Sequence, residues 1–284
     1  MYYRRDNGYK YLIDFGDFKL TKGELIILCV AFVIWTTICV FINMSITNAT
    51  LENNSKYYKA VKIDNDEELF KYGMRTHAGN ALVYGEVKAA APVSIPELSD
   101  SYFAIEKVTE KYTEHVTYDE DEDGNRTKNV SYSWDTCWRE TYLPDNVIFS
   151  GVEFPYNKIE IDNFRRLDLS DGNVSKSFSD KFHFNRIYEK SHIWERVGDK
   201  RYYYCVIPLS QKVTIFAELK DNTIYGVDGS ENARIYYNTT TQEVIEGIEK
   251  SKNYSNIGFT ILWYLLYIAL GFWFIYQRNK WADC

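Results

Sequence analysis

The sequence predicts an α+β protein in which two transmembrane helices flank a mainly β extracytoplasmic domain with a long hairpin and short helices. Two observations predict this arrangement: two long apolar runs without a charged residue, and alternating apolar and aromatic residues over much of the polar segment between them. The chain has 25 Tyr, only 5 Pro and a mean hydropathy of −0.38. The low Pro content argues against a disordered or low-complexity chain. Because the mean hydropathy is negative, the apolar residues that membrane insertion requires must be concentrated locally, and they are concentrated in the two runs.

The two apolar runs are residues 25–44, LIILCVAFVIWTTICVFINM, and residues 257–276, IGFTILWYLLYIALGFWFIY. A helix rises about 1.5 Å per residue, so each run is long enough to cross a hydrocarbon core of about 30 Å. A buried core helix is the alternative, but the polar remainder of the chain offers little to cover it on every side. For the first run a cleavable signal peptide is a second alternative. The preceding tail, residues 1–24, and the lack of an A-x-A site favour a retained anchor.

Basic residues favour an orientation with both ends in the cytoplasm. Those before the first run are Arg4, Arg5, Lys10, Lys19 and Lys22. The middle segment, in contrast, has more acidic than basic residues. By the positive-inside rule, residues 1–24 and 277–284 are predicted to be cytoplasmic tails and residues 45–256 an extracytoplasmic, lumenal domain. The reverse orientation remains the alternative.

Asn-x-Ser/Thr sequons are frequent in the middle segment and suit a glycosylated lumenal domain. The candidate glycosylation sites are Asn48, Asn53, Asn125, Asn129, Asn173, Asn238 and Asn253. A further sequon begins at Asn43, at the membrane boundary. The alternative is that polar loops cluster Asn with Ser and Thr without carrying glycans.

The middle segment is predicted to contain more sheet than helix. Residues 45–62 are expected to be extended, and Asp64 is expected to cap a short helix that ends at Tyr72. Strands are expected over residues 81–87, 157–161, 202–207, 213–218 and 233–237. Within the first of these, Gly85 marks either a bulge or a close approach of the backbone. Helices are expected over residues 163–169 and over residues 240–252, the latter leading into the second apolar run.

A long hairpin is the most distinctive prediction for the middle segment. Residues 102–117 and 130–138 both alternate with period two, and the acidic segment between them contains the Gly and Asn typical of a turn. The alternation places Tyr132, Trp134 and Trp138 on one face, which makes them the candidate interaction face. Aromatic residues at this spacing also form ordinary packed sheet faces, and the sequence leaves both interpretations open.

No catalytic, cofactor-binding or metal-binding residues are predicted. The acidic run Asp119 to Asp123 matches the start of an EF-hand loop, but Val130 stands where the loop needs a bidentate Glu. We interpret the run as a solvated hairpin tip, with weak attraction for calcium as the alternative. The four His lack metal-ligand spacing, and P-loop, H-E-x-x-H and G-x-S-x-G motifs are absent. The acidic middle segment also lacks the basic stripe that nucleic-acid binding needs.

Two cysteines, Cys137 and Cys205, share the predicted outer compartment. They would form a disulfide if their Cα atoms came within about 6 Å of each other. The other interpretation is that they are two independent small hydrophobic residues.

Four segments, in this order along the chain, carry a resemblance to a known family. They are residues 112–140, YTEHVTYDEDEDGNRTKNVSYSWDTCWRE; 158–170, KIEIDNFRRLDLS; 197–207, VGDKRYYYCVI; and 213–224, VTIFAELKDNTI. The most specific positions are Tyr132, Ser133, Thr136, Trp138, Arg139, Gly198, Asp199 and Arg201. With the two apolar runs on either side, the chain resembles the LUMA family (transmembrane protein 43) over about residues 20–276, as a shortened member with two membrane helices.

The resemblance implies a protein of the endoplasmic reticulum or inner nuclear membrane in a eukaryote, where the family self-associates and binds lamins and emerin. A bacterial member would be expected in the plasma membrane. The family usually has four membrane helices, so contacts of the second pair are not carried over. Position 134 is Trp where the family usually has Tyr, which keeps an aromatic residue at that place. The family brings no catalytic residues.

The function predicted from these observations is that of a non-enzymatic membrane scaffold. Its extracytoplasmic domain would organise membrane protein complexes and self-associate into a homo-oligomer, without a cofactor and without nucleic acid. The alternative is a membrane-anchored sensor or binding module that takes a lipid or a small ligand in the sheet domain.

Overall fold

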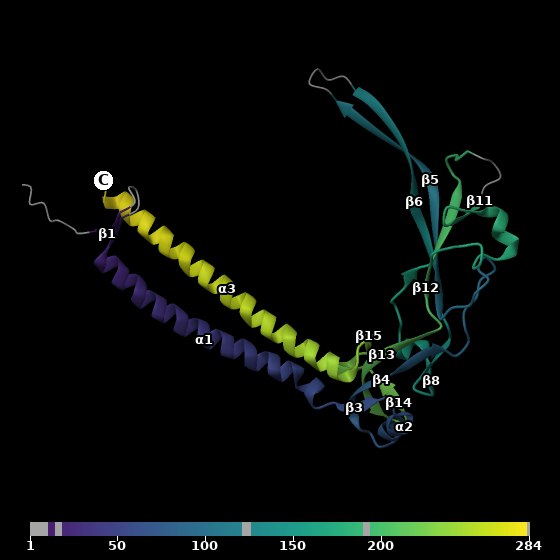
Figure 1. The fold of residues 1–284 in the computed structure, drawn as a ribbon, viewed down its shortest axis with the longest axis horizontal. Coiled ribbons are helices and arrows are strands. Elements are labelled where there is room, and N and C mark those ends of the chain that lie inside the picture. The colour runs from purple at the N-terminus through teal and green to yellow at the C-terminus, as the bar shows by residue number, and fades with distance from the viewer. Residues whose placement is uncertain (1–10, 15–18, 121–125, 190–193, 283–284) are drawn as a thin grey trace, which may run out of the picture. The chain divides into compact units, whose positions relative to one another are not determined.

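The computed structural model describes residues 11–14, 19–120, 126–189 and 194–282, which Figure 1 draws as solid ribbon. The chain divides into two compact units: a helical unit, residues 1–58 and 245–284, and a β domain, residues 59–244. The predicted fold class is confirmed, because two long apolar helices flank a mainly β domain that carries a long hairpin.

The helical unit contains a two-stranded sheet and two long helices. Strand β1 (Tyr11–Asp14) pairs antiparallel with β2 (Lys19–Thr21). The helices are α1 (Lys22–Tyr58) and α3 (Thr241–Ala282), whose first turn belongs to the β domain. Among the described residues, these two helices are long and apolar enough to cross a membrane.

Both helices extend beyond the predicted apolar runs. Because α1 continues through polar residues to Tyr58, the prediction that residues 45–62 are extended is wrong for most of that range. No Gly or Pro interrupts the segment, and hydroxyl groups bond back to the helix: Thr50 Oγ1 donates to the backbone oxygen of Ile46 at 2.8 Å. The prediction of a helix over residues 240–252 that leads into the second run is confirmed.

A Thr-x-x-Glu capping box begins each long helix. Glu24 Oε2 accepts from the backbone N–H of Thr21 at 2.6 Å, and the Glu24 N–H donates to Thr21 Oγ1 at 3.3 Å. Glu243 and Thr240 make the same two bonds at 2.8 and 3.3 Å. Each carboxylate also lies at a helix N-terminus, where the helix dipole favours negative charge. Glu24 is almost fully buried, and its other oxygen accepts from Arg278 Nη1 of α3 at 2.5 Å.

Within the helical unit, aromatic residues join α1 to α3. Trp35 and Trp263 stack with ring centroids 4.5 Å apart, and each indole N–H donates to the backbone oxygen of the other residue at 3.1 Å. Tyr267 OH donates to the backbone oxygen of Leu28 at 2.6 Å. Close packing and hydrogen bonds of this kind are what associate helices in a membrane, where the hydrophobic effect contributes little.

An Asn-x-x-x-Thr pattern occurs on both long helices. Asn43 Nδ2 of α1 donates to Thr260 Oγ1 at 3.1 Å, and Asn256 Nδ2 of α3 donates to Thr47 Oγ1 at 3.0 Å. Residues four apart lie on one helix face, so two antiparallel copies of the pattern exchange a pair of hydrogen bonds. The two helices therefore form an antiparallel hairpin with polar contacts near the ends of their apolar runs.

The β domain contains two sheets. The first has seven strands in the order β14-β13-β4-β7-β8, with β15 also paired to β13 and β3 parallel to β4. The second has six strands in the order β10-β11-β12-β5-β6, with β9 also paired to β12. The strands are β3 (Val61–Asp64), β4 (Gly79–Ala89), β5 (Ala104–Glu120), β6 (Arg126–Tyr142), β7 (Asn146–Phe149), β8 (Val152–Pro155), β9 (Arg165–Arg166), β10 (Phe182–His183), β11 (Arg186–Glu189), β12 (Lys200–Ile207), β13 (Ser210–Lys220), β14 (Thr223–Tyr225) and β15 (Arg234–Tyr237). The helices are α2 (Glu67–Arg75), η1 (Tyr156–Lys158), η2 (Lys176–Lys181) and η3 (Val227–Gly229).

Each sheet has its own hydrophobic core. The first sheet packs on α2, where the fully buried Phe70 meets Phe149 edge-on with ring centroids 5.7 Å apart. The second sheet buries Ile105, Ile187 and Tyr204 on one face, against residues of the neighbouring loops. Full burial of one such side chain stabilises the fold by about 1.5–3 kcal/mol. The second core covers one face of the second sheet near its loops and does not include the far end of the β5–β6 hairpin.

Three local predictions are wrong. Residues 157–161 do not pair as a strand, although Ile159 and Ile161 are both fully buried, so the period of two marked burial and not strand pairing. Residues 163–169 are not helical, and part of them forms β9 at the side of β12. The cap of α2 is Asp66, whose Oδ1 accepts from the backbone N–H of Leu69 at 2.8 Å, and not Asp64.

Gly85 marks a close approach and not a bulge. The register between β4 and β13 runs without a shift through the pair Val213–Gly85. A Cβ atom at Gly85 would lie 2.0 Å from Ser150 Oγ and 3.3 Å from the ring of Phe149. A larger residue at position 85 would therefore clash with Ser150 and crowd Phe149, which explains the glycine.

Candidate functional site on the hairpin arm

The predicted hairpin is confirmed and is longer than predicted. Strands β5 and β6 pair along their described length, whereas β12 pairs with β5 only as far as Lys111. Tyr112 still exchanges backbone hydrogen bonds with Gly198 and Asp199, and from Thr113 outward the two described strands pair only with each other. We call this two-stranded extension, residues 112–120 and 126–134, the arm. Figure 1 shows it extending away from the rest of the second sheet.

Strand alternation gives the arm one apolar and one polar face. Directly paired residues share a face, and successive pairs alternate between the two faces. The apolar face carries the pairs Tyr112–Trp134, Glu114–Tyr132, Val116–Val130 and Tyr118–Lys128. The polar face carries the pairs Thr113–Ser133, His115–Ser131, Thr117–Asn129 and Asp119–Thr127.

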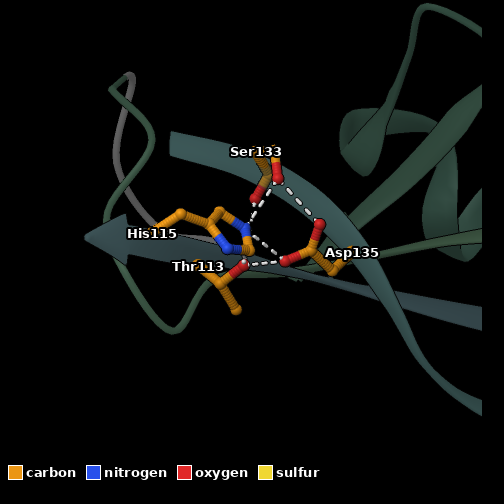
Figure 2. A network of polar contacts seen from close by, with 4 residues as sticks. All are labelled: Thr113, His115, Ser133 and Asp135. Carbon is orange, nitrogen blue, oxygen red and sulfur yellow. Dashed lines mark hydrogen bonds and ion pairs between the residues drawn. The ribbon is translucent and has the colours of Figure 1, made fainter. Parts of the chain in front are cut away.

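Side-chain hydrogen bonds join the two strands on the polar face (Figure 2). Ser133 Oγ lies 2.9 Å from His115 Nε2 and donates to Asp135 Oδ1 at 2.7 Å, while Asp135 Oδ2 lies 2.7 Å from the same His115 nitrogen. Thr113 Oγ1 donates to Asp135 Oδ2 and lies 3.1 Å from His115 Nε2. An isolated two-stranded hairpin is only marginally stable in water, so these contacts stabilise the arm.

The Ser, His and Asp of this network do not have the geometry of a catalytic triad. In a triad the carboxylate orients one imidazole nitrogen while the other nitrogen takes the proton of the serine hydroxyl. Here Ser133 Oγ and Asp135 Oδ2 contact the same nitrogen, and the side chains of His115 and Asp135 are 47% and 42% exposed. The geometry supports a structural role for the network. The expectation that the chain is not an enzyme stays a prediction.

Thr113→Val is expected to raise the pKa of Asp135. Hydrogen bonds from Thr113 and then from Ser133 are the main causes that hold the pKa of this carboxyl below its ordinary value. A carboxyl whose pKa is lowered by folding stabilises the fold above its unfolded pKa, and this contribution is lost as the pH falls through the folded pKa. The wild-type arm should therefore stay paired to a lower pH than the Thr113→Val arm, as measured by an NMR titration of the Asp135 carboxyl.

The matched control for this titration is Thr117→Val. Thr117 lies on the same face of the same strand but pairs with Asn129. An Asp135 pKa that is the same in Thr113→Val as in the wild type would contradict the role given to the Thr113 hydroxyl.

The apolar face of the arm is only partly covered. Near the sheet, Tyr112 stacks on Tyr132 with ring centroids 5.9 Å apart and an interplanar angle of 13°. Farther out, the exposed fractions are 51% for Tyr132, 39% for Val116, 43% for Val130 and 65% for Tyr118. We call these last four residues the arm strip. Contiguous exposed apolar residues with polar neighbours are typical of an interaction surface.

Trp134, at the base of the arm, is packed rather than free. The Arg201 guanidinium lies 4.4 Å from its ring, and Tyr188 meets the ring edge-on at 5.9 Å. Glu110 Oε2 holds this arginine by accepting from Arg201 Nε at 2.6 Å, and it also accepts from Arg186 Nε at 3.0 Å. The Glu110, Arg186 and Arg201 side chains are 12%, 12% and 19% exposed. One carboxylate is therefore shared by two largely buried guanidinium groups.

The prediction that Trp138 shares a face with Trp134 is wrong. Trp134 pairs with Tyr112, whereas Trp138 pairs with Thr109, so their partners lie on opposite faces of β5. The shift in register makes Cys137 an extra residue, a β-bulge, beyond which the alternation of β6 is inverted. Trp138 is 67% exposed on the opposite face. No sequence signal marked this bulge, because the aromatic residues keep their period of two across it.

The candidate glycosylation sites have different surroundings. Asn48 and Asn53 lie in α1, Asn129 in β6, Asn173 and Asn238 in turns, and Asn253 in α3, while Asn125 lies outside the described residues. Asn173 holds its turn, since its Oδ1 accepts from the backbone N–H of Ser170 at 2.8 Å. Asn238 is exposed and has a φ of 51°. Glycosylation stays a prediction at every one of these sites.

Cys137 and Cys205 are free thiols. They lie on β6 and β12, and β5 runs between these two strands. The interpretation as two independent residues is therefore the one that the fold supports.

The acidic tip is described only in part. Asp119 accepts from Asn129 Nδ2 at 2.6 Å, and the flanking elements are strands, unlike the helices that flank an EF-hand loop. Asp121 and Asp123 lie outside the described residues. In the described part of the chain, no three His, Cys, Asp or Glu side chains are placed to hold a metal ion.

Comparison with known proteins gives no relative. No family model matches the chain, and neither a curated protein nor a solved structure matches it. The resemblance to the LUMA family therefore stays a prediction from the sequence.

Proposed function

We propose that this chain is a non-enzymatic integral membrane scaffold of the LUMA type, which organises membrane protein complexes through its β domain and self-associates. The observation that carries the proposal is the arm strip, an exposed apolar surface on a domain that is joined to two long apolar helices. The polar network on the other face of the arm supports it further, because it stabilises the arm without using the strip.

In this proposal both ends of the chain are cytoplasmic and residues 45–256 face the lumen or the outside. The compartment is the endoplasmic reticulum or inner nuclear membrane in a eukaryote, with lamin- or emerin-type proteins as candidate partners, and the plasma membrane in a bacterium. The two long apolar helices support a membrane location in general and do not distinguish these compartments.

A sensor or binding module for a lipid or small ligand remains the alternative function. Ligand sites are mostly apolar cavities with a few convergent polar groups. A hollow of about 660 Å³ on the β domain is instead lined by polar and charged residues, among them Lys158, Glu218, Lys220 and Glu231. This hollow therefore lacks the apolar lining that such a ligand would need.

Crosslinking of the full-length protein in its native membrane, followed by mass spectrometry, tests the proposal. The wild type should crosslink to itself and to a few membrane proteins in stoichiometric amounts. Tyr132→Ala should weaken these contacts about tenfold or more, as expected for an aromatic residue that contributes strongly to an interface. Trp138→Ala is the matched control, because Trp138 is exposed on the opposite face of the same strand.

Two outcomes would contradict the scaffold. One is a protein that crosslinks to nothing and co-purifies with lipid, which would favour the ligand-binding module. The other is an equal loss of contacts in Tyr132→Ala and Trp138→Ala, which would point to a general loss of folding and not to a surface on the arm.

A further inference from the structure

We infer that the arm strip pairs face to face with the arm strip of a second copy of this chain, with the two arms antiparallel and a two-fold axis at the Val116–Val130 pair. This inference rests on the proposed scaffold function and names one interface through which it would operate. It follows from what covers the strip, from the charges beside it and from its size.

The strip is only partly covered within the described chain. Val116, Tyr118, Val130 and Tyr132 are between 39% and 65% exposed, and the arm carries them beyond the last pairing with β12. The opposite face of the arm is polar and bears the Asn129 sequon, so a glycan there would leave the strip free. Exposed apolar residues that alternate regularly on one face of a ribbon fit a partner of the same shape, as in two packed sheets.

The charges beside the strip select a second copy in the antiparallel arrangement. Glu114 lies one pair before the Val116–Val130 pair, and Lys128 lies one pair after it, on the other strand. Both are exposed, and neither forms an ion pair with another described residue. When the two arms run antiparallel and the two-fold axis passes through the Val116–Val130 pair, Glu114 of each copy lies opposite the Tyr118–Lys128 pair of the other copy. Two symmetric ion pairs then flank an apolar centre, as a self-complementary interface requires.

The parallel arrangement lacks this complementarity. There each pair of residues faces the same pair of the other copy, so Glu114 faces Tyr132 and finds no cation at its level. In the antiparallel arrangement Tyr132 also comes opposite the pair that contains Tyr118, which adds an aromatic contact on each side of the axis. Aromatic pairs contribute beyond their buried area, and an unpaired carboxylate at an apolar contact is unfavourable.

The size of the strip predicts an interface that depends on the membrane. The strip spans two strands about 4.8 Å apart and about four residues of about 3.4 Å each along the strands. Even with the side chains included, its area is only a few hundred Å². A stable soluble complex buries roughly 800 Å² per partner, which is well above this area. Copies held in one bilayer have a far higher effective concentration than free copies. Pairing is therefore expected in membranes and not in dilute detergent.

Cysteine crosslinking of the full-length chain in proteoliposomes tests this pairing. Val130→Cys is made in a Cys137→Ser background, which removes the exposed thiol of the bulge, and Ser131→Cys in the same background is the matched control. Val130 lies on the two-fold axis, whereas Ser131 is the next residue and lies on the polar face. Oxidation should give a disulfide-linked dimer with Val130→Cys, none with Ser131→Cys, and a loss of the Val130 dimer when the membrane is diluted with excess lipid.

A charge exchange tests the register. Added to Val130→Cys, Glu114→Lys should abolish the dimer, and Glu114→Lys with Lys128→Glu should restore it. Equal dimer from Val130→Cys and Ser131→Cys, or no dimer from Val130→Cys, overturns the inference. If Val130→Cys gives no dimer while Tyr132→Ala still loses its crosslinks to other membrane proteins, self-pairing fails and the scaffold remains. If Val130→Cys gives no dimer and Tyr132→Ala keeps its crosslinks to other membrane proteins, both the self-pairing and the scaffold function are overturned.

Discussion

Glu110→Ala is expected to destabilise the second sheet at the base of the arm by about 2–4 kcal/mol. Breaking a fully buried ion pair costs roughly 3–5 kcal/mol, and the expected cost here is somewhat smaller because some water reaches the site. Glu110 accepts from Arg186 at 3.0 Å and from Arg201 at 2.6 Å, and these three side chains are no more than 19% exposed. Without the carboxylate, two like charges remain close together and poorly hydrated. Arg201 should then leave the Trp134 ring, which loosens the attachment of the arm.

Hydrogen exchange of β12 in the purified full-length protein measures this effect. The amides of Lys200–Ile207 should exchange faster in Glu110→Ala, by the factor that corresponds to the lost free energy of opening. Glu106→Ala is the matched control on the same face of β5. Glu106 accepts from Arg139 Nη1 at 2.9 Å, but Arg139 is 55% exposed and is hydrated when it loses its partner. The expected cost there is about 1 kcal/mol or less. Equal exchange in the two variants would contradict the special role of Glu110.

Trp263→Ala is expected to weaken the pairing of α1 with α3 by about 1–3 kcal/mol, from the lost aromatic contact and the lost interhelical hydrogen bond. Trp263 stacks on Trp35 at 4.5 Å and donates to its backbone oxygen at 3.1 Å. No water competes for that oxygen inside a bilayer, so its lost bond is not readily replaced.

The separation of the two helices in proteoliposomes measures this effect, through the distance between spin labels placed on α1 and α3. Trp263→Ala should broaden the distribution of distances toward longer values. Trp273→Ala is the control on the same helix, since Trp273 is 60% exposed and faces away from the core of the pair. A distribution in Trp263→Ala as narrow as in Trp273→Ala would show that the stack does not hold the pair.

Much of the fold could be predicted because its signals are local. An uncharged apolar run sets a helix by composition alone, and the period of two over residues 102–117 and 130–138, with a turn between, sets a hairpin. The prediction that Tyr132 and Trp134 share a face of the sheet is confirmed, because both lie on regularly paired positions. Trp138 was placed on the wrong face because the bulge at Cys137 changes the register without changing the local pattern.

The errors elsewhere have a common cause. Residues 45–58 are polar, which suggested an extended chain, yet they continue a helix that has already been nucleated by the apolar run and contains no Gly or Pro. Ile159 and Ile161 alternate like a strand and are buried, yet they pair with no strand: the Ile159 N–H donates to the Tyr156 backbone oxygen, and the Ile161 backbone oxygen accepts from Tyr156 OH. In both cases the local pattern correctly indicated whether the side chains are exposed or buried. The conformation and pairing of the backbone depended instead on the neighbouring structure.

By itself, the sequence determined the α+β class, the two membrane-type helices and the amphipathic hairpin, because hydrophobicity and periodicity act over a few neighbouring residues. Only the tertiary structure decided which surfaces of the hairpin stay free. Glu110 meets Arg186 and Arg201 across 76 and 91 residues of sequence, and this contact covers Trp134 while leaving Val116, Val130 and Tyr132 exposed. Such contacts depend on strand order and register, which are set by the packing of the whole domain and leave no local mark in the chain.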